Sequence, residues 1–242
     1  MDIKLEKTVG DAASITIFNG TVWWITGGIA NGFADKTTEM LKIDNGNIVG
    51  KLDNSPQLLH TMTGHCMARI DNDRVFIAGG NSKEAFIYHE LYNNYTVLPD
   101  IVHRTNTHGA ACSTVNLDGT LMLLIVGGET WGVSNPGERS IMYDMTNCSS
   151  PVANCPGEWV YDDKMLHGLG SFIDGAYVTY NDERGFVLSG GETNEHVEED
   201  ISNRLLNFNE TAGSFRKLRF MMKQKRQGHS AVIIPDGDIK CS

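Results

Sequence analysis

Short apolar segments recur along this chain, and each one ends in two glycines. β-Branched and aromatic residues dominate these segments, as is typical of buried strands. Each segment follows a turn sequence, such as Asn19-Gly20 or Asp118-Gly119, and a second short strand pattern precedes that turn. The repeating unit is therefore strand, turn, strand and diglycine. The segments and their glycines are residues 22–26 with Gly27-Gly28, 75–78 with Gly79-Gly80, 121–126 with Gly127-Gly128, and 186–189 with Gly190-Gly191.

The spacing of the diglycines defines a repeat. Successive copies lie 52, 48 and 63 residues apart, which is the period of a repeat architecture. A polar loop and then an aromatic pair follow the diglycine in the last three units, and the first unit lacks this pair. The third unit carries nine extra residues within its pair, including Cys148 and Cys155. The pairs are Tyr88 and Tyr95, Tyr143 and Trp159, and Phe208 and Phe215.

This pattern resembles the Kelch repeat. Besides the period, the diglycine and the aromatic pair, the last unit carries Arg226 and His229 as Arg-x-x-His, and His65 stands at the corresponding point of the second unit. The resemblance implies an all-β fold, a propeller whose blades are four-stranded antiparallel sheets. Its glycines, aromatic pairs and histidines are then expected to pack the blades, with His65 and His229 bonding between strands. The approximate units are residues 13–63, 64–107, 108–173, 174–227 and 228–242.

The fifth unit stops before its diglycine. Gly79 follows His65 by fourteen residues, and the same count from His229 ends one position beyond Ser242. Kelch propellers usually have six blades, so the sequence predicts an incomplete ring of four blades and part of a fifth. We expect the remaining blades to come from the rest of a longer chain, with completion by a partner chain as the alternative. An open ring would expose strand edges and an apolar blade face.

Function is expected in the loops that the resemblance to Kelch proteins places at one end of the propeller. These loops join the second strand to the third, or the fourth strand to the next blade. They are residues 30–38, 81–84, 129–138 and 192–201, and residues 56–63, 100–107, 163–173 and 220–227. Large or charged residues in them mark the candidate partner contacts. These candidates are His103, Arg104, Glu129, Trp131, Glu192, His196 and Arg226.

The chemistry of these candidates suggests what they would contact. Arg104 and Arg226 come first, because a guanidinium group binds a carboxylate through two parallel hydrogen bonds. Trp131 would anchor a protein partner, or it folds back over its own blade. Glu192 and His196 belong to an acidic loop that suits a cation or a basic partner, or that is simply solvated.

Net charge and hydropathy exclude two classes of partner. The chain has 20 basic and 30 acidic residues, a net charge of −10, so no nucleic-acid partner is expected. A basic set between Arg216 and Arg226 is interpreted as a solvated strand face and its loop. The longest apolar run, residues 121–126, is far too short to cross a membrane, so no membrane insertion is expected.

The cysteines and glycosylation sequences bear on the compartment. Cys148 and Cys155 are predicted to form a disulfide that pins a hairpin loop, which favours an extracellular or secretory compartment over the cytoplasm. Cys66 and Cys112 are interpreted as small buried apolar residues on inner strands. Four Asn-x-Ser/Thr sequences occur, and the one in the tight turn at Asn19 is a poor acceptor. The possible glycosylation sites are Asn94, Asn147 and Asn209.

The sequence therefore favours a non-catalytic interaction module that binds a protein or another ligand. No acid, base or nucleophile set recurs, and neither a metal site nor a cofactor is predicted. One alternative is a propeller enzyme, either glycan-processing or resembling the copper-radical oxidases. For the latter, Tyr177, Tyr180, Cys66 and Cys112 offer the residue types but no diagnostic spacing. A second alternative is the substrate adaptor of a ubiquitin ligase, which would need a further domain.

Overall fold

The chain folds into four consecutive four-stranded antiparallel sheets. The computed structural model describes residues 4–5, 10–101, 109–117, 119–128, 140–148, 155, 157, 159–162, 176–179, 186–190, 204–209 and 214–224. Within these residues the chain forms strands and turns and no helix. The prediction of an all-β fold with four-stranded antiparallel sheets is confirmed. The boundaries of the repeat units stay a prediction, and the fifth unit lies outside the described residues.

Each sheet is built from strands that follow one another in the sequence. The first holds β1 (Ala13–Ile17), β2 (Val22–Thr26), β5 (Thr38–Asp44) and β6 (Asn47–Leu52) in that order. The second holds β7 (His65–Arg69), β8 (Arg74–Gly79), β9 (Ala85–His89) and β10 (Asn94–Val97). The third holds β11 (Ala111–Leu117), β12 (Thr120–Val126), β13 (Ser140–Asp144) and β14 (Trp159–Asp162). The fourth holds β15 (Ala176–Thr179), β16 (Phe186–Ser189), β17 (Arg204–Asn209) and β18 (Ser214–Met221). A small hairpin, β3 (Ile29–Ala30) with β4 (Phe33–Ala34), follows β2.

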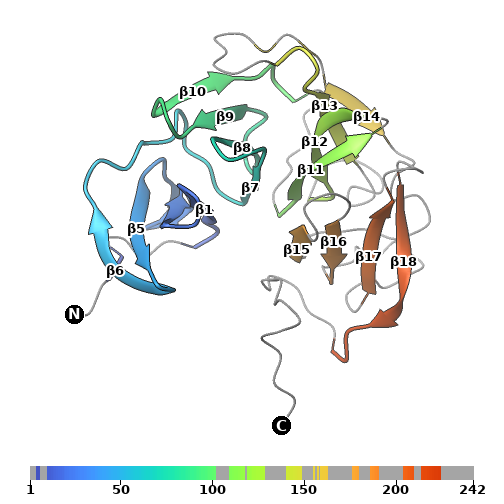
Figure 1. Cartoon of the computed structure of the whole chain (residues 1–242), viewed down its shortest axis with the longest axis horizontal. Helices are drawn as coiled ribbons and strands as arrows, with labels where there is room; N and C mark the ends of the chain where they lie inside the picture. The colour runs from blue at the N-terminus through green and yellow to red at the C-terminus, as the bar shows by residue number, and fades with distance from the viewer. Residues whose placement is uncertain are drawn as a thin grey trace.

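The four sheets stand around a common centre like the blades of a propeller. Figure 1 shows the first strand of each sheet, β1, β7, β11 and β15, toward the inside of the arc and the fourth strand toward the outside. The inner strands contact one another in sequence, β1 with β7, β7 with β11 and β11 with β15. The apolar segments that precede the diglycines form the second strand of each sheet, as the sequence predicted.

Hydrophobic clusters fill the spaces between consecutive blades. Alternate side chains of a strand point to opposite faces of its sheet, so one strand serves two clusters. In β8, Val75 packs toward the first blade and its neighbour Phe76 toward the third, and both are fully buried. A third cluster joins the third blade to Leu188 and Phe215 of the fourth. The core is therefore a series of contacts between blades.

The predicted aromatic pairs are cross-strand partners. Tyr88 lies opposite Tyr95, Tyr143 opposite Trp159, and Phe208 opposite Phe215. The nine extra residues of the third unit therefore leave its register intact. The Tyr88 ring packs 4.5 Å from Trp24 of the first blade, measured between centroids. Burial, and then the charges of Glu90 and Asp73, raise the pKa of Tyr88 to about 12.

The diglycines stand where one blade meets the next. Gly27 has a φ of +58°, and a Cβ there would lie 2.5 Å from the Met62 carbonyl oxygen and 2.9 Å from His65 Cε1. Gly80 likewise packs against the backbone of Thr63. Only glycine combines this backbone conformation with such close contact. The prediction that these glycines are structural is confirmed for the first two units.

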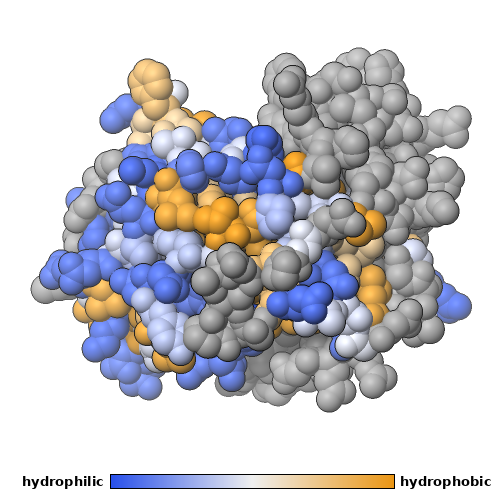
Figure 2. Space-filling model, turned by 90° about the horizontal axis from the view of Figure 1, so that it is seen from above, coloured by the Kyte–Doolittle hydropathy of each residue, from blue (hydrophilic) through white to orange (hydrophobic). Residues whose placement is uncertain are grey.

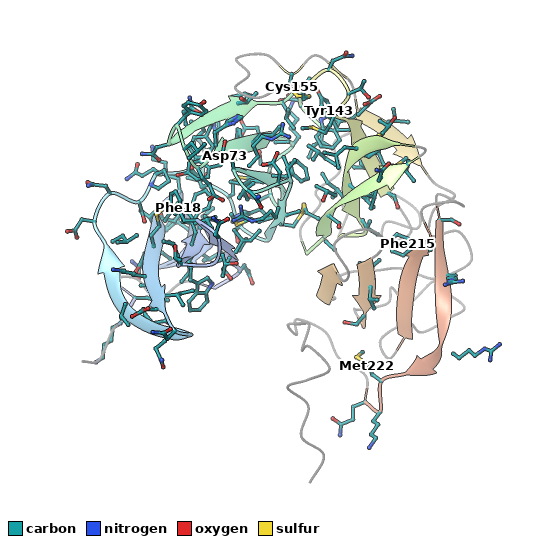
Figure 3. The ribbon with its side chains drawn as sticks, in the orientation of Figure 1. Phe18, Asp73, Tyr143, Cys155, Phe215 and Met222 are labelled. Atoms are coloured by element: carbon teal, nitrogen blue, oxygen red, sulfur yellow. A yellow bond between two sulfur atoms is a disulfide. The ribbon has the colours of Figure 1, made fainter. Side chains whose placement is uncertain are left out.

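The structure confirms one cysteine prediction and corrects another. Cys148 and Cys155 are bonded across the loop between β13 and β14, with their Cα atoms 4.7 Å apart. Tyr143 lies beside Cys155 in Figure 3, and its hydroxyl donates a hydrogen bond to the Cys155 carbonyl. The interpretation of Cys66 and Cys112 as separate apolar residues is wrong. Their sulfur atoms are bonded to each other, and this disulfide joins inner strands β7 and β11 of adjacent blades, with the two Cα atoms 5.4 Å apart.

Candidate partner-binding face

The strand order gives each blade two ends of different character. One end carries the loops between second and third strands and the links to the next blade, which in the first two blades are residues 27–37, 53–64 and 80–84. We call this end the loop face. The opposite end carries the tight turns between first and second strands and between third and fourth strands, including residues 18–21, 45–46, 70–73 and 90–93. We call it the turn face.

A pocket of about 500 Å³ opens on the loop face between the first and second blades. Its lining comes from three segments that the sequence had singled out, residues 30–38, 56–63 and 81–84. The sequence predicted these loops as part of the binding face, but none of the individual lining residues as a partner contact. The lining residues include Lys36, Leu59, His60, Asn81, Ser82 and Glu84.

Backbone hydrogen bonds hold these three segments together. Leu58 donates its N–H to the Lys36 carbonyl at 3.0 Å, and Met62 donates to the Asp35 carbonyl at 3.1 Å. The Asp35 carboxylate accepts the N–H groups of Lys36 and Thr37 and so fixes the turn that carries the lysine. The pocket wall is therefore pre-formed, with little backbone left to order when a ligand binds.

A second set of contacts fixes the part of the wall contributed by the second blade. Asn81 Oδ1 accepts the Thr63 N–H at 3.1 Å, and the Asn81 N–H donates to the Thr63 carbonyl at 3.2 Å. Glu84 Oε2 accepts the Ser82 hydroxyl, while Glu84 Oε1 lies 3.2 Å from His60 Nε2. The His60 ring also stacks on Phe86, with 5.9 Å between ring centroids.

These contacts leave the pocket rich in hydrogen-bond donors. The Glu84 carboxylate is already engaged by Ser82 and His60. The Lys36 ammonium group and the Asn81 side-chain N–H2 have no partner within the described part of the chain. Leu59 adds an apolar surface with 41% of its area exposed. The pocket can therefore receive an acceptor-rich group beside an apolar one.

The predicted partner contacts themselves cannot be placed on this face. His103, Arg104, Glu129, Trp131, Glu192, His196 and Arg226 all lie outside the described residues. Their roles stay predictions. The loop segments around the pocket are the part of the predicted face that the structure describes.

His65 bonds between strands, as expected, and it does so between blades. Its Nε2 lies 2.8 Å from the Thr26 hydroxyl of β2, at the edge of Gly27. Burial lowers the pKa of His65 to about 4, so the ring is neutral at neutral pH. His65 is therefore a structural residue of the blade interface.

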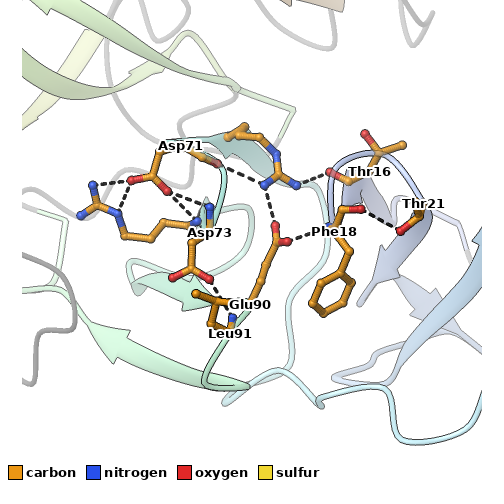
Figure 4. A network of polar contacts seen from close by, with 9 residues as sticks. Thr16, Phe18, Thr21, Asp71, Asp73, Glu90 and Leu91 are labelled. Carbon is orange, nitrogen blue, oxygen red and sulfur yellow. Dashed lines mark hydrogen bonds and ion pairs between the residues drawn. The ribbon is translucent and has the colours of Figure 1, made fainter.

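A continuous polar network crosses the turn face (Figure 4). The buried Glu90 carboxylate lies 2.5 Å from the Arg69 guanidinium group and accepts the Phe18 N–H at 2.6 Å. Arg69 also donates to the carbonyls of Thr16 and Asp71. The Asp71 carboxylate in turn pairs with Arg74, whose guanidinium group donates to the Cys148 carbonyl at 3.3 Å. This network joins the first blade to the disulfide loop of the third.

Comparison with solved structures settles the fold. The solved structure of YjhT superimposes with a TM-score of 0.64 over 92% of this chain and 73% of that one, at 13% sequence identity. This chain is a β-propeller. The likeness at this identity concerns the fold alone. No family model and no curated protein matches the sequence.

The described residues contain no group of three or more histidine, cysteine, aspartate or glutamate side chains arranged to hold a metal ion. The same residues contain no helix that is long and apolar enough to cross a membrane.

Proposed function

We propose that this chain is a Kelch-type propeller that binds a partner protein through its loop face, without catalysis. The observation that carries the proposal is the pocket between the first two blades, because all its lining residues come from loops. Propellers generally use the loops at one end for recognition and the strands for support. We assign the group that enters the pocket as an acidic side chain or a chain-terminal carboxylate of the partner.

The free polar groups of the pocket support an acidic ligand. Lys36 supplies a positive charge and Asn81 an amide donor, and neither is used within the described chain. A hydrogen bond between such a cation and a carboxylate is about twice as strong as one between neutral groups. Leu59 would contact the apolar part of the same segment.

The cysteine pairing supports binding over copper-radical chemistry. That chemistry needs a cysteine joined covalently to a tyrosine. Cys66 and Cys112 are bonded to each other, so neither thiol is free for such a link. Tyr177 lies on β15, and Tyr180 lies outside the described residues.

We also propose that the protein works in an oxidising compartment, outside the cell or in the secretory pathway. Four of its five cysteines form two disulfides, whereas stable structural disulfides are rare in the cytosol. This compartment disfavours the role of substrate adaptor for a ubiquitin ligase, which operates in the cytosol.

Selection from a displayed random-peptide library tests the binding proposal. We expect the immobilised full chain to enrich peptides that contain aspartate or glutamate, or that end in a free carboxylate. Lys36→Glu should weaken a selected peptide at least tenfold, because it reverses the charge that the ligand meets. Lys42→Glu is the matched control, since Lys42 is also exposed but lies on β5 outside the pocket.

Two outcomes would contradict this proposal. One is that no acidic peptide is enriched on the folded protein. The other is that selected peptides bind Lys36→Glu and Lys42→Glu with the same affinity as the unaltered chain. Disulfide content, measured by mass before and after reduction, confirms that each variant is folded and oxidised.

A further inference from the structure

The glycosylation sequences of this chain gather at one end of the propeller. Asn19 lies in the turn between β1 and β2, and Asn94 begins β10 after the turn from β9. Asn147 lies in the loop between β13 and β14, and Asn209 is the last residue of β17. All four positions belong to the turn face. The last three lie in or directly beside the connection from third strand to fourth, in three successive blades.

Asn94 stands out because an exposed aromatic residue precedes it by two positions. Tyr92 has 53% of its surface exposed and Leu91 has 77%, so two large apolar side chains protrude from one tight turn. Asn94 is exposed too, and its amide makes no hydrogen bond within the described part of the chain. Thr96, the third residue of the sequence Asn94-Tyr95-Thr96, completes the acceptor motif.

The turn that displays Tyr92 is held rigidly. Glu90 and Leu91 donate their N–H groups to the Asp73 carbonyl and carboxylate, at 2.8 and 2.7 Å. The Tyr88 hydroxyl donates to Asn93 Oδ1 at 3.1 Å, and Asn93 itself has a φ of +48°. A turn fixed at these points keeps an aromatic ring in water without letting it collapse onto the core. The exposed Tyr92 ring held in this way offers a flat surface on which a ligand ring can pack.

We propose that Asn94 carries an N-linked glycan whose first sugar ring packs on Tyr92, and that the turn face is the glycan-bearing end of this propeller. The face of a pyranose ring presents C–H bonds, which carry partial positive charge. The face of an aromatic ring carries partial negative charge, so the two faces attract each other and also exclude water. The proposal rests on the oxidising compartment proposed above, and not on the peptide-binding pocket.

The modification is a glycosyl transfer from a lipid-pyrophosphate-linked oligosaccharide in the secretory pathway. Asn94 Nδ2 attacks the anomeric carbon of the first sugar, and a C–N bond forms. The bond between that carbon and the pyrophosphate oxygen breaks, and the lipid pyrophosphate leaves with the electron pair. Nδ2 loses one proton to a base of the transferase, and nothing is oxidised or reduced.

A glycan at this place would protect an open strand edge. β10 is the outermost strand of its blade, and Val97 on it has 61% of its surface exposed. Figure 2 looks onto the molecule from above the β10 side of Figure 1 and shows a band of apolar side chains among polar ones. A bulky hydrophilic chain beside such an edge blocks pairing with another strand. The loop face, with its pocket, would stay bare for a partner.

Secretion of the full chain from cells with a eukaryotic glycosylation pathway tests the proposal. A heterologous signal peptide directs the chain into that pathway. Enzymatic removal of N-glycans in 18O-labelled water then marks each occupied asparagine in peptide maps. We expect label at Asn94, and Asn94→Gln should remove one glycan from the intact mass.

The contact with Tyr92 is tested by comparing two variants with and without the glycan. Tyr92→Ala should lower the Tm of the glycosylated protein by about 2–4 °C and leave that of the deglycosylated protein unchanged. Leu91→Ala is the matched control, because it removes a neighbouring exposed apolar side chain and should have the same effect on both forms.

Either of two results would overturn the proposal. An unoccupied Asn94 in the secreted, disulfide-bonded protein would exclude the glycan. An equal effect of Tyr92→Ala on both forms would exclude the sugar contact. Peptide selection on deglycosylated protein addresses the pocket separately, so a failure of one proposal is distinguishable from a failure of the other.

Discussion

The junction between the first and second blades and the junction between the second and third use different chemistry for the same task. Both contain tilted pairs of aromatic rings, Trp24 with Tyr88 in one and Phe76 with Trp159 in the other. The first junction adds polar contacts, from His65 to Thr26 and from Glu90 to the Phe18 backbone. The second adds a covalent bond between inner strands β7 and β11.

The difference shows which conditions each junction tolerates. A disulfide carries no titratable group, so a reductant breaks it and acid alone does not. A buried neutral histidine depends on pH, because protonation must be accommodated in a dry environment. Acid should therefore loosen the first junction, and a reductant the second.

Removal of the disulfide between blades should have the largest effect. Cys66 and Cys112 close a loop of 46 residues, whereas Cys148 and Cys155 close a loop of 7. Because the entropy lost by the unfolded chain grows with loop length, the double variant Cys66→Ala/Cys112→Ala should lose about 4 kcal/mol of unfolding free energy. Urea unfolding measures this loss. The control Cys148→Ala/Cys155→Ala should lose about 2 kcal/mol, and an equal or reversed order would contradict the assignment.

Acid should weaken the first junction through His65. The folded-state pKa is about 4, below the ordinary value of 6.5, so the unfolded chain takes up a proton first as the pH falls. The contribution of neutral His65 to the free energy of unfolding is fully present above pH 6.5. It is lost progressively as the pH falls toward 4, by about 3 kcal/mol in total. His65→Gln should remove this part of the pH dependence. The free energy of unfolding of the unaltered chain and of His65→Gln is compared at pH 7 and pH 4.5. If both proteins lose the same amount between the two pH values, His65 does not titrate as described.

Glu90 should matter nearly as much to the first junction. Glu90→Ala leaves the Arg69 guanidinium group and the Phe18 N–H without their carboxylate. We expect a loss of about 2–3 kcal/mol, smaller than for a fully buried pair because Arg69 is partly exposed. Lys83→Ala, which breaks an ion pair exposed on both sides, should cost less than about 1 kcal/mol. Glu90→Ala should raise amide hydrogen-exchange rates mainly in the first two blades. A rise mainly in the third blade would contradict this prediction.

Much of this fold could be predicted because each repeat carries its own local signals. The turns and the aromatic pairs depend on neighbours within one blade, and the diglycines recur at one place in each unit, so their spacing suffices to place them. The Cys66–Cys112 bond depends on a relation between two blades. In the strand register, Cys66 lies opposite Ala78, the last residue before its diglycine, whereas Cys112 lies opposite Ile125, the second-last residue before its own. Because alternate residues of a strand face opposite sides of the sheet, this offset of one residue directs the two cysteines from adjacent blades toward each other. The offset was a signal available in the sequence.

The pocket was only partly predictable for a related reason. Lys36 and Asn81 lie in loops that the repeat pattern had placed on the loop face. The distance between Lys36 and Asn81 depends on how the loops pack against each other, which the repeat pattern of the sequence does not determine. The β3–β4 hairpin, whose tip exposes 78% of Phe33, was likewise absent from the expected elements.

The smallest expected effect tests how closely the first two blades approach. Gly27→Ala places a Cβ 2.5 Å from the Met62 carbonyl oxygen at a φ of +58°, so both strain and overpacking should destabilise the junction, by about 2 kcal/mol. Gly20→Ala is the control, because Gly20 also has a positive φ, +80°, but open space around its Cβ position. It should cost about 1 kcal/mol from backbone strain alone. If Gly27→Ala and Gly20→Ala lower the free energy of urea unfolding equally, Met62 and His65 move aside to accommodate the Cβ. The first junction is then deformable, in contrast to the disulfide-bonded second junction.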